Sequence, residues 1–101
     1  MASRLELHEV LCGILGSRNV YYDPPESVKM QYDAIRYSRT KIDNVFANNS
    51  VYAQHDRYEV IAIYRNPDSE LPRNISKLPR CIHERSYISN NLRHDVFILY
   101  H

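Results

Sequence analysis

The segment from His55 to Arg65, HDRYEVIAIYR, most constrains the fold of this chain. Successive side chains of a β-strand point to opposite faces of the sheet, so this segment has two distinct faces. One face carries Tyr58, Val60, Ala62 and Tyr64, and the other carries Ile61 and Ile63. Because both faces are apolar, the segment predicts a central strand that is covered on both sides.

A helix is predicted over residues 3–15. Ser3 and Glu6 have the spacing of a capping box, in which each side chain bonds a main-chain N–H at the start of the helix. Apolar residues then follow at helical spacing, namely Leu7, Val10, Leu11, Ile14 and Leu15. Gly16 comes next as a C-terminal cap. The result is an amphipathic helix with one apolar stripe.

Four further segments are predicted to be extended. Residues 20–22 form a short strand, and Asp23-Pro24-Pro25 fixes an extended bend after it. Residues 33–39 read as a longer strand. Two final strands, residues 81–89 and 93–101, flank Asn90-Asn91, which tolerate the positive φ angles of a tight hairpin.

A second, weaker helix is predicted after residue 66. Leu71, Ile75 and Leu78 lie at i, i+4 and i+7, the spacing of one helical face. Pro72 is compatible with this helix only in its first turn, and Pro79 ends it.

Residues 40–54, TKIDNVFANNSVYAQ, contain neither glycine nor proline and have no strong periodicity. Polar residues typical of exposed loops surround Ile42, Val45 and Phe46. Such a long, partly apolar connection is unusual inside a compact domain and indicates a function or a partner. We predict a projecting arm, or alternatively a flexible loop that becomes ordered on assembly.

Together these segments give the order α-β-β-β-α-β-β. The predicted fold is α+β, a mostly antiparallel sheet of about four to five strands with two helices. The 101 residues are expected to form one domain, residues 1–101, because so short a chain has no room for a second core.

The composition argues against several classes of function. Thirteen basic and twelve acidic residues nearly cancel, which argues against a dedicated nucleic-acid binder and suits a subunit that associates. The two glycines, Gly13 and Gly16, are too few for a glycine-rich phosphate loop. Cys12 and Cys81 form no CxxC pair and are expected to be reduced thiols in a reducing cytosol. Neither a signal-peptide pattern nor an apolar run of roughly 20 residues is found.

The five histidines are the first candidates for catalytic or metal-binding roles: His8, His55, His83, His94 and His101. A two-residue turn at the final hairpin places His83 opposite Ile98, four pairing steps from His94. That separation is about 13 Å, too far for one metal ion. The same register pairs Ser86 with Asp95 and Glu84 with Phe97, on a face that no histidine shares. We therefore predict no catalytic residue, no metal and no cofactor.

The nine tyrosines, in a chain without tryptophan, have three interpretations. They form strands well and are suited to a sheet core. They are also enriched at protein interfaces, because each ring combines a large apolar area with a polar tip. Alternatively, they stack on bases in a single-stranded nucleic-acid-binding domain, although the balanced charge disfavours that reading.

The chain as a whole resembles the small tail-terminator proteins of long-tailed bacteriophages, also called tail-completion or head–tail joining proteins. The resemblance rests on three stretches in order: ILGSRNVYYDPPESVKMQYDAIRYS, YEVIAIYRNPDSELPRNISKLPRC and NNLRHDVFILY. The family's hairpin turn often reads Asp-Asn-Leu-x-His, whereas this chain has Asn90-Asn91-Leu92-Arg93-His94. Pro72 inside the second helix is also atypical of the pattern.

The resemblance implies a non-enzymatic virion protein of the neck or upper tail, assembled in the host cytoplasm. Its subunits would form a sixfold homo-oligomeric ring that contacts the tail tube protein on one side and the head-completion or connector protein on the other. Genomic DNA would pass through the lumen without specific binding, and no membrane would be involved. The interface residues that we predict are Tyr21, Tyr22, Ile42, Val45, Phe46, Asn90 and Asn91. The alternative within the same particle is a head-completion or other neck or tail-tube subunit.

Overall fold

The computed structural model describes residues 4–47 and 50–101. Its elements are α1 (Arg4–Leu15), β1 (Val20–Tyr22), β2 (Ala34–Ala47), β3 (Ser50–Tyr64), α2 (Leu71–Ser76), β4 (Cys81–Ser89) and β5 (Leu92–Tyr100). The predicted α+β class and the order α-β-β-β-α-β-β are confirmed. Ser3, the expected helix cap, lies outside the described residues.

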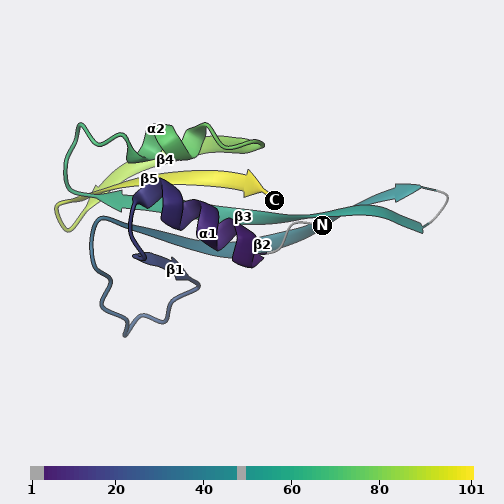
Figure 1. Cartoon of the computed structure of the whole chain (residues 1–101), viewed down its shortest axis with the longest axis horizontal. Coiled ribbons are helices and arrows are strands. Elements are labelled where there is room, and N and C mark those ends of the chain that lie inside the picture. The colour runs from purple at the N-terminus through teal and green to yellow at the C-terminus, as the bar shows by residue number, and fades with distance from the viewer. Residues whose placement is uncertain (1–3, 48–49) are drawn as a thin grey trace.

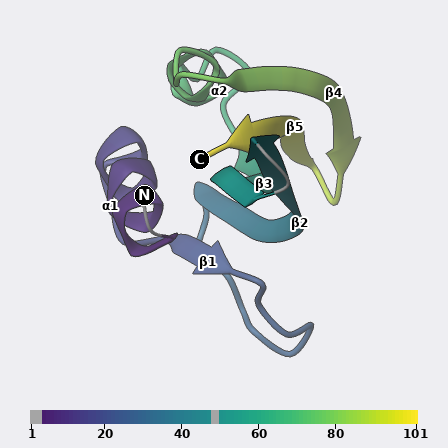
Figure 2. The ribbon, with the colours of Figure 1, turned by 90° about the vertical axis from the view of Figure 1, so that its right-hand side faces the viewer.

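The five strands form one sheet in the order β1-β2-β3-β5-β4. β1 pairs with β2 in parallel, and the other neighbours are antiparallel. β3 is central, as its apolar residues on both faces predict. The sheet is strongly curved, with both helices on the same side of it (Figures 1 and 2).

The main core lies between this face of the sheet, here called the helix face, and the two helices. β3 contributes the four buried residues that sequence alternation placed together, Tyr58, Val60, Ala62 and Tyr64. α1 contributes Leu7, Leu11 and Cys12, and α2 contributes Leu71 and Ile75. Pro72 falls in the first turn of α2, where its missing N–H has no intrahelical partner to lose.

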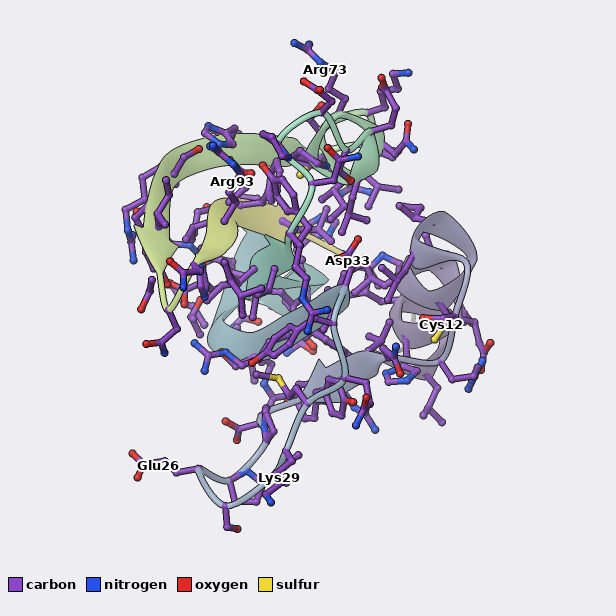
Figure 3. All side chains as sticks on the ribbon, turned by 90° about the vertical axis from the view of Figure 1, so that its left-hand side faces the viewer. Cys12, Glu26, Lys29, Asp33, Arg73 and Arg93 are labelled. Atoms are coloured by element: carbon purple, nitrogen blue, oxygen red, sulfur yellow. The ribbon has the colours of Figure 1, made fainter. Side chains whose placement is uncertain are left out.

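A smaller cluster covers part of the opposite face. Ile61, Ile63 and Val96 are buried there against Met30 and Tyr32. Met30 and Tyr32 belong to the connection between β1 and β2, residues 23–33, which starts at the double proline. The connection is tied to the sheet at two points, since the Asp23 N–H donates to the Tyr37 carbonyl (2.8 Å) and the Gln31 N–H donates to the Tyr21 hydroxyl (3.0 Å). Its tip, with Glu26 and Lys29, points away from the sheet (Figure 3).

Residues 40–54 are mostly strand, which differs from the sequence-based expectation. β2 continues past Arg39 to Ala47, and β3 begins at Ser50 rather than His55. The two segments pair with each other, for example Ile42 with Asp56 and Asn44 with Gln54. Periodicity does not reveal these strands because neither face of them is a continuous apolar face, and the main-chain ladder alone defines them.

We call residues 40–47 and 50–56 the ribbon. β5 pairs with β3 only from Arg57 to Tyr64, so the ribbon has no third strand beside it among the described residues. It extends well beyond the sheet (Figure 1), and the molecule measures 51 × 27 × 22 Å along its principal axes.

Neither described helix resembles a membrane span, since α1 has 12 residues and α2 has 6.

Candidate protein interface

A β-bulge in β4 changes the register that the sequence predicted for the final hairpin. The irregularity lies between His83 and Arg85. His83 therefore pairs with Phe97, so the expected pairings of His83 with Ile98 and of Glu84 with Phe97 are wrong. The extra residue of a bulge turns the preceding part of the strand over, and no glycine or proline in the sequence indicates where this happens. His83 consequently lies on the helix face, where its ring meets the Phe97 ring edge-on at 5.2 Å.

The bulge brings a histidine to a buried carboxylate, which the sequence reading had excluded. Ser86 pairs with Asp95 as predicted, and its hydroxyl donates to the Asp95 carboxylate. His83 Nε2 lies 2.9 Å from Asp95 Oδ1, and the Tyr64 hydroxyl donates to Asp95 Oδ2 at 2.5 Å. Asp95 is only 6% exposed, so these three partners replace the water that its charge would otherwise require.

This network has the residue types of a Ser–His–Asp triad but a different geometry. In a triad, one ring nitrogen faces the carboxylate and the other faces the serine, so that the ring relays a proton. Here the same atom, His83 Nε2, faces both Asp95 (2.9 Å) and the Ser86 hydroxyl (3.1 Å). The arrangement joins β4 to β5 and to Tyr64 of β3, which is a structural role for a strand at the sheet edge.

The protonation of the network follows from these contacts. Burial acts to raise the pKa of Asp95, but hydrogen bonds from Ser86, Tyr64 and His83 outweigh it and hold that pKa below its ordinary value. Burial and the hydrogen bond to Asp95 raise the pKa of Tyr64 to about 12. Asp95 is therefore charged and Tyr64 is neutral at physiological pH. Across residues 4–47 and 50–101, no three His, Cys, Asp or Glu side chains gather in a way that could hold a metal ion.

The ribbon is held firmly where it leaves the sheet. Asp56 exchanges two main-chain hydrogen bonds with His101 (2.9 and 3.1 Å), directly after the end of β5. The Asp56 carboxylate accepts a hydrogen bond from the Tyr58 hydroxyl (3.3 Å) and lies 3.8 Å from the Arg39 guanidinium. Tyr58 is itself buried, so the root of the ribbon is fixed to the main core.

A group of aromatic rings on the helix face connects the root of the ribbon to α1. Tyr37 lies between the rings of Tyr58 (6.0 Å) and Tyr22 (4.9 Å). Its hydroxyl contacts His8 Nδ1 at 2.8 Å and accepts a hydrogen bond from Arg4 at 3.3 Å. The Arg4 guanidinium also lies 4.3 Å from the centre of the Tyr22 ring. Burial, followed by the charges of Arg18 and Arg4, lowers the pKa of His8, which is therefore neutral at physiological pH.

The structure distributes the predicted interface residues over three places. Tyr21 and Tyr22 are in β1, where both are half-buried and bonded or packed within the chain. Ile42 is in the ribbon and is 49% exposed. Val45 and Phe46 are also strand residues of the ribbon, but their side chains lie outside the described part. Asn90 and Asn91 form the exposed hairpin turn at the opposite end of the sheet, with φ angles of 52° and 62°.

Sequence reasoning missed an exposed apolar edge on β4. Ile82, Tyr87 and Ile88 are 62%, 39% and 64% exposed, and β4 is an outermost strand of the sheet. The alternation of the segment was visible in the sequence. Its position at the edge was not, because β5 returns between β3 and β4.

Most tyrosines of the described chain do not form a stacking platform. Tyr37, Tyr58 and Tyr64 are buried in the core, and among the large apolar side chains that the structure shows to be well exposed, Tyr87 is the only tyrosine. Tyr87 stacks on His94 within the chain, with ring centres 4.6 Å apart. Comparisons with protein-family models, curated proteins and solved structures found no match.

Proposed function

We propose that this chain is a bacteriophage tail-terminator subunit, which forms a ring on the head-proximal end of the tail tube and joins it to the head connector. The observation that carries the proposal is the ribbon. It is rooted in the core through Asp56 and Tyr58, and it extends beyond the sheet without a third strand beside it among the described residues.

A two-stranded hairpin is marginally stable alone in water, so a long one is better explained by a partner that it contacts. The free edges of the ribbon offer main-chain groups to a neighbouring subunit, and such pairing gives a directional, repeatable contact. Head-to-tail contacts form a ring when the rotation from one subunit to the next closes, which is the symmetry that a tail requires. Ile42, half-exposed on the ribbon, and the apolar sequence around Val45 and Phe46 fit the same role.

The remaining features are compatible with a subunit that acts by assembly alone. The formal charge of +1 leaves little repulsion between copies and little attraction for DNA passing through a lumen. The Ser86–His83–Asp95 network stabilises a strand edge and has no relay geometry. The ring's partners are the tail tube protein on one face and the head-completion or connector protein on the other, in the neck of the virion.

A shortened ribbon tests the proposal. In this variant an Asn-Gly turn replaces residues 43–55. The turn connects Ile42 to Asp56, two residues that pair in the native sheet. The domain should still fold, because β5 pairs with β3 only from Arg57 onward. We expect the variant to fail to form rings and to leave tails unable to join heads in a complementation assay.

The matched control is Arg73→Ala, which removes an exposed side chain of α2 that points away from the sheet (Figure 3). It should complement fully. If the shortened ribbon complements as well as the Arg73→Ala control, the ribbon has no role in assembly and the proposal loses its main support.

A further inference from the structure

β4 is an edge strand that carries exposed apolar side chains. It is the last strand of the sheet, with no element of the described chain beyond it (Figure 2). Proteins commonly protect such edges with proline, charged side chains or bulges. Cys81–Ser89 has a bulge and the charges of Glu84 and Arg85, but no proline or lysine. β4 also exposes three large apolar side chains, those of Ile82, Tyr87 and Ile88.

The bulge gives β4 a symmetry that a regular strand of this sequence would lack. Cys81, His83, Ser86 and Ile88 pair with alternate residues of β5 and share the helix face. Ile82 and Tyr87 share the opposite face. Three pairs of positions equally distant from the Glu84–Arg85 peptide bond therefore share a face, namely 83 with 86, 82 with 87 and 81 with 88. An antiparallel pair needs this property, because residues directly opposite each other project to the same side.

We propose that two free copies of this chain pair through their β4 edges, antiparallel, about a twofold axis at Glu84 and Arg85. Ile82 of one copy then lies opposite Tyr87 of the other, which covers exposed apolar surface on both. Cys81 lies opposite Ile88, and His83 lies opposite Ser86. The two bulges meet at the axis, so the extra residue of one strand is matched by that of the other.

The main chain has the alternation that this pairing requires. The Tyr100 N–H donates to the Arg80 carbonyl, so Arg80 faces β5 and the groups of Cys81 and His83 face outward. At the other end, Ser89 and Leu92 flank a two-residue turn and bond each other, so the groups of Ile88 and Ser86 face outward. The outward-facing residues are those that the proposed register pairs, Cys81 with Ile88 and His83 with Ser86.

The charges of Glu84 and Arg85 favour the same register. Glu84 and Arg85 already form an ion pair within the strand at 3.1 Å. The twofold axis places each Glu84 opposite the Arg85 of the other copy, giving four alternating charges. A shift of the register by one position in either direction breaks the match of faces, because a one-residue slip moves side chains to the opposite face.

This contact goes beyond the proposed function. It is isologous, with the same surface on both copies, whereas a ring needs a head-to-tail contact. It concerns the free chain and does not depend on whether the chain caps a tail.

Sedimentation velocity of the purified chain across concentrations, from micromolar to millimolar, tests the pairing. We expect a reversible monomer–dimer equilibrium. Arg85→Glu places Glu84 opposite a glutamate twice per dimer and should weaken association roughly tenfold. Exchanging both charges, Glu84→Arg with Arg85→Glu, restores opposite charges across the axis and should recover the dimer. Both residues are exposed in the monomer, and circular dichroism checks that each variant is folded.

Amide hydrogen exchange gives a second readout that identifies the surface. On dimerisation, exchange should slow at Cys81, His83, Ser86 and Ile88, whose N–H groups face outward, and not at Ile82 and Tyr87, which already face β5. A chain that stays monomeric at millimolar concentration overturns the proposal. A dimer that ignores Arg85→Glu, or one that protects the ribbon instead of β4, overturns it as well.

Discussion

At the scale of single residues, the contacts of buried Asp95 depend on a strand register that differs from the predicted one. Asp95 is nearly inaccessible and accepts contacts from Tyr64, Ser86 and His83, each supplied by a strand. A buried charge without such partners is costly. The bulge, which no sequence pattern marks, places His83 beside this charge. Asp95 itself was predicted opposite Ser86, and its contacts with Tyr64 and His83 were missed.

Asp95→Asn should lower the free energy of unfolding by about 2–3 kcal/mol at pH 7, because the buried amide accepts fewer hydrogen bonds than the carboxylate. The folded pKa of Asp95 lies below that of the unfolded chain, so its ionisation stabilises the fold above about pH 4. This contribution is lost as the pH falls through the folded pKa. Urea unfolding at several pH values should show the gap between wild type and variant narrowing below pH 4. A gap that is constant with pH would assign Asp95 no electrostatic role.

The hairpin turn offers a matched pair of substitutions. Asn91 has a φ angle of 62°, which residues with a β-carbon adopt unwillingly and glycine adopts freely. Asn91→Ala should destabilise the domain by about 1 kcal/mol, whereas Asn91→Gly should be neutral or stabilising. Thermal unfolding of both variants checks this. Equal melting temperatures would contradict the two-residue turn with positive φ angles.

At the scale of elements, the sequence predicted what depends on local pattern and missed what depends on strand order. The helical spacing of residues 3–15 predicted α1, and the alternation of residues 55–65 predicted the centre of β3. Pro72 lies in the first turn of α2, as the sequence required. The ribbon was not recognised as strand, because its stability comes from main-chain pairing rather than a buried face. The exposed edge of β4 was missed because topology, not composition, puts a strand at an edge.

The hydrogen bond between Tyr58 and Asp56 should stabilise the ribbon at the point where it leaves the sheet. Tyr58→Phe removes the hydroxyl that donates to Asp56 while keeping the buried ring. We expect a loss of about 1 kcal/mol in stability, with faster amide exchange at Asp56 and its neighbours in β3 and no change in α1. Exchange measured by NMR tests this, and protection that is unchanged at Asp56 would show that the His101 main-chain pairing alone fixes the root.

At the scale of the whole molecule, the chain combines a small curved sheet, two helices on one face and a ribbon that reaches beyond both (Figure 1). Among the described residues, the ribbon and β4 both have main-chain edges with no further strand beside them. The ribbon suits a head-to-tail contact, and the self-matching β4 suits a twofold one. The sequence predicted an arm or loop at residues 40–54, but not which strand edges are open, because that depends on which strands lie side by side.

The measurement that tests the central claim most directly is imaging of phage tails assembled with and without this protein. With it, we predict a sixfold ring of this chain at the head-proximal end of every tail tube, tubes of uniform length and tails able to join heads. Without it, tubes should vary in length and remain unjoined. Tails of normal length that join heads in its absence would contradict the claim.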